Sequence, residues 1–153
     1  MKIYNIKEKL EFLEEVATLT QEEWGNKSYT KMQKEEKIKK KMEKIKNNLN
    51  NPNYCKLILV DNNTLVGFVS IFEHDSSERE DLTPWYATLY IKEKYRGMGL
   101  SKVLNDAIIN EAQKRQFQKI YLKTYLVNFY EKYGFLYMET LNNGERLYVK
   151  NLK

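Results

Sequence analysis

The chain has 153 residues, of which 42% are hydrophobic and 31% charged, and it carries a formal net charge of +5. This length suits one domain, residues 1–153, and lets the chain bury enough surface to fold without disulfides. The single cysteine, Cys55, has no partner for an internal disulfide, which fits a reducing compartment. Neither a signal peptide nor an apolar run of the ~20 residues that cross a bilayer is visible, so we expect a cytoplasmic protein that does not contact membranes.

The N-terminal third predicts one strand followed by two helices. Residues 2–5 form the strand, and Asn5, with a glutamate three residues later, resembles the capping pair of a helix that ends at Gly25. Ser28 is expected to cap the second helix, which ends before Pro52.

The positive charge is concentrated in residues 27–46, which hold nine lysines against three glutamates. A basic segment of this kind can bind nucleic acid or an acidic partner. Apolar residues interrupt it at helical spacing, and Glu35 and Glu36 precede Lys39 and Lys40 by four residues, the favourable order for ion pairs on a helix. The pattern therefore favours a solvated helix face over a nucleic-acid site.

The remaining two thirds alternate between strands and helices. Residues rich in β-branched and aromatic side chains predict strands, and amphipathic spacing predicts helices. The expected elements are strands at 54–60 and 64–72, a polar loop at 74–84, a strand at 85–91, a helix from 100, a strand at 119–124, a short helix at 127–133, and a hairpin at 135–141 and 146–149. This order predicts an α/β fold with a mixed sheet and helices on its faces.

The stretch between the strand at 85–91 and the next helix carries a pattern suited to binding anions. Gly97 and Gly99 allow a tight turn, and the free N–H groups of the following helical turn suit a pyrophosphate. Arg96 and Lys102 add positive charge. The stretch matches neither the P-loop, which has another spacing, nor the dinucleotide fingerprint, whose third glycine is replaced by Lys102.

Two motifs together resemble one enzyme family. The residues Arg96-x-x-Gly99-x-Ser101 resemble the R/Q-x-x-G-x-G/A signature of the GNAT family of N-acetyltransferases. Downstream, residues 129–135 read Phe-Tyr-Glu-Lys-Tyr-Gly-Phe and are similar to that family's F-Y-E-K-x-G-F segment. The element order is also similar, so the resemblance covers nearly the whole chain.

The resemblance implies a mostly antiparallel central sheet flanked by helices, with acetyl-CoA as cosubstrate. The strand at 85–91 would splay from the strand at 119–124 and leave backbone groups free for the pantetheine arm. Tyr130 would be the general acid that protonates the departing thiolate. The backbone positions implied in binding acetyl-CoA are Leu89, Tyr90 and Ile91 for the pantetheine arm, and Arg96, Gly97, Met98, Gly99, Leu100 and Ser101 for the pyrophosphate.

Acyl transfer from a thioester to an amine needs a neutral amine, and therefore a proton acceptor. Glu23, Glu73 and His74 are the candidates for this base, and Glu23 is preferred. Cys55 lies in an apolar strand pattern and is expected to be simple packing. No cluster of His, Cys and Asp has metal-ligand spacing, so no metal is expected.

The sequence therefore predicts an N-acetyltransferase that passes the acetyl group directly to a primary amine on a small molecule or peptide. One alternative is a basic nucleic-acid-binding module that uses residues 27–46. The other is a protein that binds acetyl-CoA with little turnover. The acceptor and the oligomeric state have no signature in the sequence.

Overall fold

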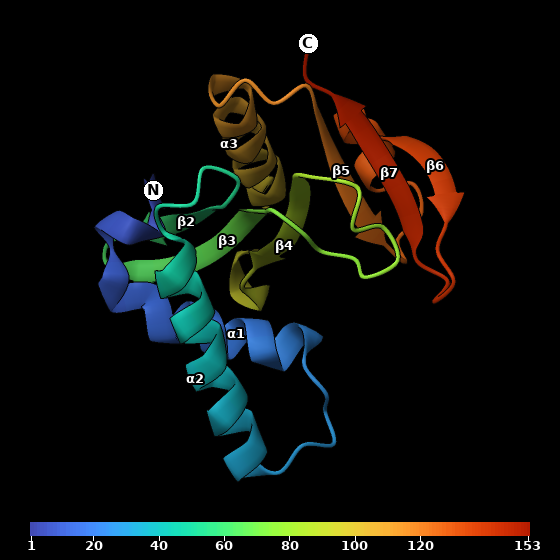
Figure 1. The fold of residues 1–153 in the computed structure, drawn as a ribbon. Helices are drawn as coiled ribbons and strands as arrows, with labels where there is room; N and C mark the ends of the chain where they lie inside the picture. The colour runs from blue at the N-terminus through green and yellow to red at the C-terminus, as the bar shows by residue number, and fades with distance from the viewer.

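A computed structural model describes all residues, 1–153, and shows a seven-stranded sheet with helices on both faces (Figure 1). No helix is long and apolar enough to span a membrane. The strands and α-helices are β1 (Lys2–Asn5), α1 (Leu13–Trp24), α2 (Lys31–Asn48), β2 (Cys55–Asp61), β3 (Thr64–Phe72), β4 (Trp85–Ile91), α3 (Leu100–Lys114), β5 (Lys119–Thr124), β6 (Leu136–Thr140) and β7 (Arg146–Asn151).

The strand order is β1-β2-β3-β4-β5-β7-β6, and every neighbouring pair is antiparallel except β4 and β5. The parallel pair is joined by a single residue pair, Trp85 with Tyr121. The Tyr121 N–H also donates to the Pro84 carbonyl at 3.1 Å. The expected mixed, mostly antiparallel sheet is confirmed, and its backbone ladder is nearly interrupted between β4 and β5.

The helices cover opposite faces of the sheet. In Figure 1, α3 lies on one side of β2, β3 and β4, and α1 and α2 lie on the other. Leu104 and Ile108 of α3 are fully buried in the larger core cluster. A smaller cluster joins Val16 of α1 and Ile45 of α2 to Phe68 of β3. Alternate residues of the central strands therefore face two separate cores.

Two predicted helix caps are wrong. Asn5 caps only a short 3₁₀ turn, in which its side chain accepts from the Lys7 N–H at 3.1 Å, and α1 begins later, at Leu13. Ser28 does not cap α2. Thr30 does so through a capping box with Gln33, because its side chain accepts from the third helical N–H and the glutamine reaches back.

Other details follow from single residues. The segment predicted as a helix at 127–133 forms only a 3₁₀ turn, Tyr130–Tyr133, which ends at Gly134 with φ of +87°. The strands predicted at 54–60 and 64–72 form the hairpin of β2 and β3, in whose turn Asn62 and Asn63 both have positive φ. On α2, only Ile45 is buried, so this helix is mostly a solvated face, as expected.

A bulge in β4 interrupts its register with β3. Phe68 pairs with Tyr90 and Ser70 pairs with Ala87, so one β3 residue faces two residues of β4, Thr88 and Leu89. Thr88 has φ of +51°, a strained conformation for a β-branched residue. The bulge lies on the strand that borders the gap in the ladder.

Candidate active site

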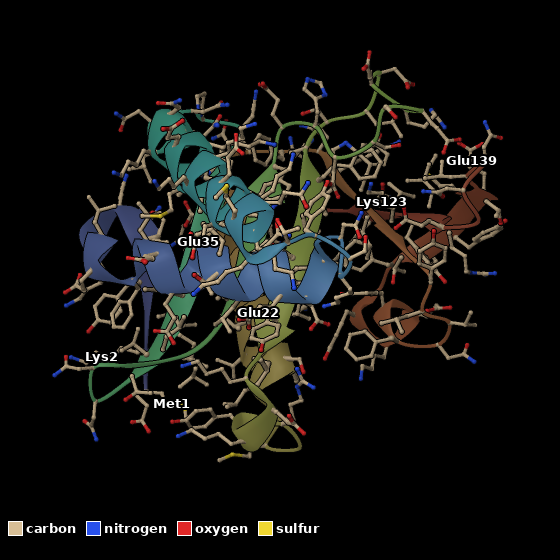
Figure 2. The ribbon with its side chains drawn as sticks, turned by 90° about the horizontal axis from the view of Figure 1, so that it is seen from below. Met1, Lys2, Glu22, Glu35, Lys123 and Glu139 are labelled. Atoms are coloured by element: carbon tan, nitrogen blue, oxygen red, sulfur yellow. The ribbon has the colours of Figure 1, made fainter.

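The gap between β4 and β5 opens into a cavity of about 620 Å³. Its walls come from β4, β5, the end of α1, the β3–β4 loop and the β6–β7 turn. Figure 2 views the face covered by α1 and α2, with Glu22 marking the C-terminal end of α1 and Lys123 marking β5. The lining residues are Glu23, Trp24, Asp75, Tyr86, Ala87, Thr88, Leu89, Leu122, Lys123, Thr124, Tyr125, Leu126, Tyr130 and Glu145.

The β4 edge that borders this cavity has backbone groups without sheet partners. β4 and β5 pair only at Trp85 and Tyr121, so the edge beyond Trp85 is free on the β5 side. Leu89, Tyr90 and Ile91 all lie on this stretch. An extended chain with amide groups could pair with it as another strand would. The splayed strands implied by the resemblance are present.

The glycine loop leads from β4 into α3 with the geometry of an anion site. Gly97 and Gly99 have φ of +80° and +76°, and a Cβ added at either would meet no atom within 4 Å. Both glycines are therefore required by the backbone turn, and the space in front of them is open. α3 begins at Leu100, so the N–H groups of its first turn follow directly.

The two basic side chains of this loop are already engaged within the protein. The Arg96 Nε donates to the Ile91 carbonyl at 2.8 Å, and the guanidinium lies 5.7 Å from the centre of the Tyr90 ring. Lys102 forms an ion pair with Asp106 at 2.7 Å. Arg96 thus holds the loop against the end of β4, and the backbone N–H groups at the start of α3 are donors that an anion can reach beside these two positive charges.

Tyr130 lies at the start of the 3₁₀ turn and lines the cavity. Its ring packs edge-on against Tyr86, Phe135 and Phe129, with ring centres 5.7, 5.9 and 4.8 Å away. Burial, with a smaller effect from Tyr133, raises the pKa of Tyr130 to about 12. The phenol is therefore protonated at neutral pH and able to donate.

The three candidate bases lie in different places. Glu23 lines the cavity beside Trp24. Glu73 accepts a hydrogen bond from Asn53 at 2.7 Å and does not line the cavity. His74 lines a neighbouring polar hollow. The structure thus brings Glu23 and Tyr130 to one cavity and leaves the other two candidates outside it.

Sequence reasoning missed Asp75, which lines both the cavity and the neighbouring hollow. Burial raises the pKa of Asp75 to about 6, while Lys123 acts to lower it and Glu145 to raise it. Lys123 and Glu145 lie 3.7 Å apart as an ion pair. Asp75 follows His74 in a polar loop, and nothing in that pattern distinguishes it from the other acidic residues there.

Cys55 is packed in the core, as expected. It is 2% exposed, and burial raises the pKa of its thiol to about 11. A thiol that stays protonated and out of solvent is a poor nucleophile. A covalent route through Cys55 is therefore disfavoured.

Comparison with known proteins agrees with this geometry. The family model of the acetyltransferase (GNAT) family matches residues 13–135. A spermine/spermidine N(1)-acetyltransferase from Bacillus subtilis (strain 168) is 30% identical over 97 residues, which are 58% of this chain and 64% of that protein.

Two solved structures show the same fold across the whole chain. The PaiA N-acetyltransferase from Thermoplasma acidophilum, in complex with coenzyme A, has a TM-score of 0.69 and 23% identity, with 99% of each chain covered. The aminoglycoside 6'-N-acetyltransferase from Enterococcus faecium has a TM-score of 0.71 and 18% identity, covering 100% of this chain and 98% of that one. With its splayed strands and glycine loop, this chain belongs to the acetyltransferase (GNAT) family.

Proposed function

We propose that this protein transfers the acetyl group of acetyl-CoA to a primary amine on a small, multiply charged cation of the polyamine class. The observation that carries the proposal is the acidic lining of the cavity beside the free edge of β4. Three acidic residues, Glu23, Asp75 and Glu145, line the cavity together with one basic residue, Lys123. They come from three separate elements, so the acidity is a property of the folded site.

The donor side of the site fits the pantetheine arm and pyrophosphate of acetyl-CoA. The β4 edge at residues 89–91 lacks a partner strand on the β5 side and offers main-chain partners to the amides of the arm, apart from the Ile91 carbonyl that the Arg96 Nε occupies. The open loop at residues 96–101 offers N–H groups at a helix start to the pyrophosphate. The cosubstrate supplies the activated acetyl group, and the related Thermoplasma structure contains coenzyme A.

The acceptor side favours a cation. Lys123 is paired with Glu145, so Glu23 and Asp75 are the carboxylates left to attract an ammonium group. Trp24, half exposed at the same wall, adds an aromatic face for a cation–π contact. The Bacillus relative is named for spermine and spermidine, which are cations of this kind.

The residues of the cavity have different roles in the proposed reaction. Glu23 and Asp75 hold the acceptor by charge and orient one amine toward the β4 edge. Tyr130 donates to the sulfur that leaves, which stabilises the negative charge developing there. No covalent intermediate on the protein is required, because both substrates fit one cavity at near-attack distance.

The test is an acceptor panel assayed by release of free thiol from acetyl-CoA. The panel contains spermidine, an aminoglycoside, a lysine-containing peptide and a neutral monoamine. We expect spermidine to be acetylated with the highest kcat/KM, and Glu23→Gln to raise the KM for spermidine more than the KM for the monoamine. Preference for the neutral amine would refute the polyamine assignment.

The two alternative functions have their own outcomes in this experiment. Binding of acetyl-CoA with no acetylated product from any amine would favour a protein with little turnover. Salt-sensitive DNA or RNA binding that is lost in a Lys39→Gln/Lys40→Gln variant, without transfer, would favour the nucleic-acid module. In the proposed enzyme this variant keeps full activity, because both lysines are exposed on α2 and neither lines the cavity.

A further inference from the structure

A lysine is buried near the start of β2, beneath α1 and α2. Lys56 of β2 is 2% exposed, and no ion pair joins it to a carboxylate. Its Nζ lies 5.3 and 5.4 Å from the ring centres of Phe68 and Phe72. Burying an ammonium group without a counter-ion is costly, so a residue of this kind needs an explanation beyond packing.

A row of hydrogen bonds connects this amine to the candidate active site. The Lys56 Nζ donates to the Ser70 Oγ at 2.7 Å, and the Ser70 Oγ shares a hydrogen bond of 2.7 Å with the Thr88 Oγ1. The row crosses β2, β3 and β4 on the face covered by α1 and α2. Thr88 can reach Ser70 because of the bulge that gives it φ of +51°.

Thr88 lies at the junction of two cavities. It lines the 620 Å³ cavity with Glu23 and Tyr130, and it also lines a smaller cavity of about 150 Å³. The smaller cavity is bounded by Lys56 itself and by Lys41 and Lys44 of α2. The amine is thus two hydroxyl groups away from the proposed acceptor site and also borders a cavity beneath α2.

The surroundings of Lys56 favour its neutral form. Burial above all lowers its pKa to about 7, against an opposing effect of Cys55 and with smaller lowering effects of Lys44 and Lys41. The other titratable neighbour at the small cavity is Tyr54, whose own pKa is raised by burial. α1 contributes only Ala17 and Thr20 to this cavity, so no carboxylate faces Lys56 there.

We propose that the Lys56–Ser70–Thr88 row is a proton path that accepts the proton given up by the acceptor amine during acetyl transfer. The inference rests on the proposed function, since it needs an amine bound beside Thr88. Geometry carries it: two hydrogen bonds of 2.7 Å link a buried amine to a hydroxyl at the acceptor cavity.

The proton balance of the step is simple. The acceptor nitrogen forms its bond to the acetyl carbon as the bond from that carbon to the coenzyme A sulfur breaks, and the thiolate leaves beside the Tyr130 hydroxyl. The nitrogen loses a proton to the Thr88 hydroxyl oxygen. When Lys56 is neutral, its Nζ can turn its lone pair toward Ser70 and accept across the same contact. The Thr88 hydroxyl then passes its own proton to the Ser70 oxygen, and the Ser70 hydroxyl passes its proton to the Lys56 Nζ. Lys56 becomes an ammonium ion and then releases one proton to water through the small cavity under α2. Neutral amine is thereby regenerated for the next turnover.

The first experiment compares pH profiles of kcat for spermidine acetylation. The kcat of the parent is expected to fall as pH falls through about 7, because protonated Lys56 can no longer accept a proton. This falling part of the pH profile is called the acidic limb. Lys56→Met and Thr88→Val, which keeps the branched shape, are each expected to lower kcat about 100-fold at pH 8 and to abolish this limb. Affinity for acetyl-CoA stays unchanged.

The second experiment is designed to shift the acidic limb of the kcat profile without changing Lys56, Ser70 or Thr88. Lys44→Gln removes a positive charge that lowers the pKa of Lys56, so the limb should shift to higher pH. Lys39→Gln is the matched control on the same helix, because Lys39 is exposed and outside the small cavity, and it should leave the limb in place. A purely structural Lys56 would give no such shift.

The outcomes separate this inference from the proposed function. A parent protein that acetylates no amine overturns both. A parent that acetylates spermidine while Lys56→Met keeps the limb and at least half of kcat overturns the proton path alone. If Lys56→Met does not fold, the other two variants test the proton path. An acidic limb that is unchanged in both Thr88→Val and Lys44→Gln overturns the path. Loss of the limb in Thr88→Val and its shift to higher pH in Lys44→Gln support it.

Discussion

The hydroxyl of Tyr130 is predicted to stabilise the leaving sulfur by hydrogen bonding more than by complete proton transfer. The pKa of Tyr130 is raised to about 12 by burial, whereas a free thiol titrates near ~8.5. Complete transfer from the phenol to a thiolate is therefore unfavourable. A hydrogen bond to a charged partner contributes ~1.5–3 kcal/mol. Tyr130→Phe is thus expected to lower kcat by roughly 10- to 150-fold.

The substitution isolates the hydroxyl because the ring stays in place. Its edge-on contacts with Tyr86 and Phe135 involve no hydroxyl oxygen and should persist. Thermal stability and acetyl-CoA affinity are therefore expected to match the parent. Tyr133→Phe is the control, since Tyr133 packs against Phe129 in the same turn but does not line the cavity.

The assay is single-turnover thiol release at saturating acetyl-CoA, which prevents slow product release from hiding the chemical step. Because the phenol remains protonated below about pH 11, the ratio of parent to variant should be constant from pH 6 to 9. Two results would refute the reasoning. One is a Tyr130→Phe rate within twofold of the parent, a change below ~0.5 kcal/mol. The other is a ratio that titrates between pH 7 and 9.

Three further predictions test the anion loop, the acidic wall and the buried amine. Gly99→Ala is expected to weaken acetyl-CoA binding at least tenfold, as measured by isothermal calorimetry. Gly144→Ala is the control, because it also forces a side chain into positive φ but should leave the affinity unchanged. Equal losses of affinity in the two variants would refute a role for the loop. The KM for spermidine should fall as pH rises through about 6, because Asp75 ionises there and then attracts the cation. Asp75→Asn should remove this pH dependence of KM. A dependence that persists in the variant would contradict a role for Asp75 in binding the acceptor. Below pH 7 Lys56 is protonated in both the folded and the unfolded protein, and its pKa of about 7 in the fold, against 10.5 in the unfolded chain, means that folding must bury this charge at a cost. Lys56→Met should therefore raise the free energy of unfolding by roughly 3–5 kcal/mol below pH 7, and the gain should fall between pH 7 and 10.5 in urea titrations. A loss of stability at pH 6 would contradict this.

The elements that the sequence predicted well are those with strong local signals. Runs of β-branched and aromatic residues, together with turn signals between them, located the strands, and paired glycines located the turn before α3. The start of α1 was wrong because Asn5 has the chemistry of a cap for either a 3₁₀ turn or an α-helix. Ser28 and Thr30 are equally good caps on paper, and the reciprocal bond of Gln33 selects Thr30.

The candidate site was predictable only where a motif spans it. The glycine loop and Tyr130 carry family motifs, whereas Asp75 and Lys56 belong to none. Asp75 acquires its raised pKa from burial beside Glu145, which is 70 positions away in the sequence and approaches only through the folded hairpin of β6 and β7. Lys56 sits in a strand pattern where a lysine is normally expected to point to solvent. Tertiary packing alone gives both residues their properties.

The single pair that joins β4 to β5 has a consequence for the mechanics of the fold. Strands β1–β4 and β5–β7 share one backbone contact and are otherwise held together by side chains. These are the core beneath α3, a small cluster that includes Trp85 and Leu147, and the ion pair of Arg79 with Glu139. An extended pantetheine arm lying along the free edge would act as a missing strand and tie the two halves of the sheet together. Amide hydrogens along the second half of β4 should then exchange quickly in the free protein and slowly in the complex, while those between β2 and β3 stay protected in both. The substrate would in this sense complete the sheet, and the protein would be most rigid at the moment when transfer occurs.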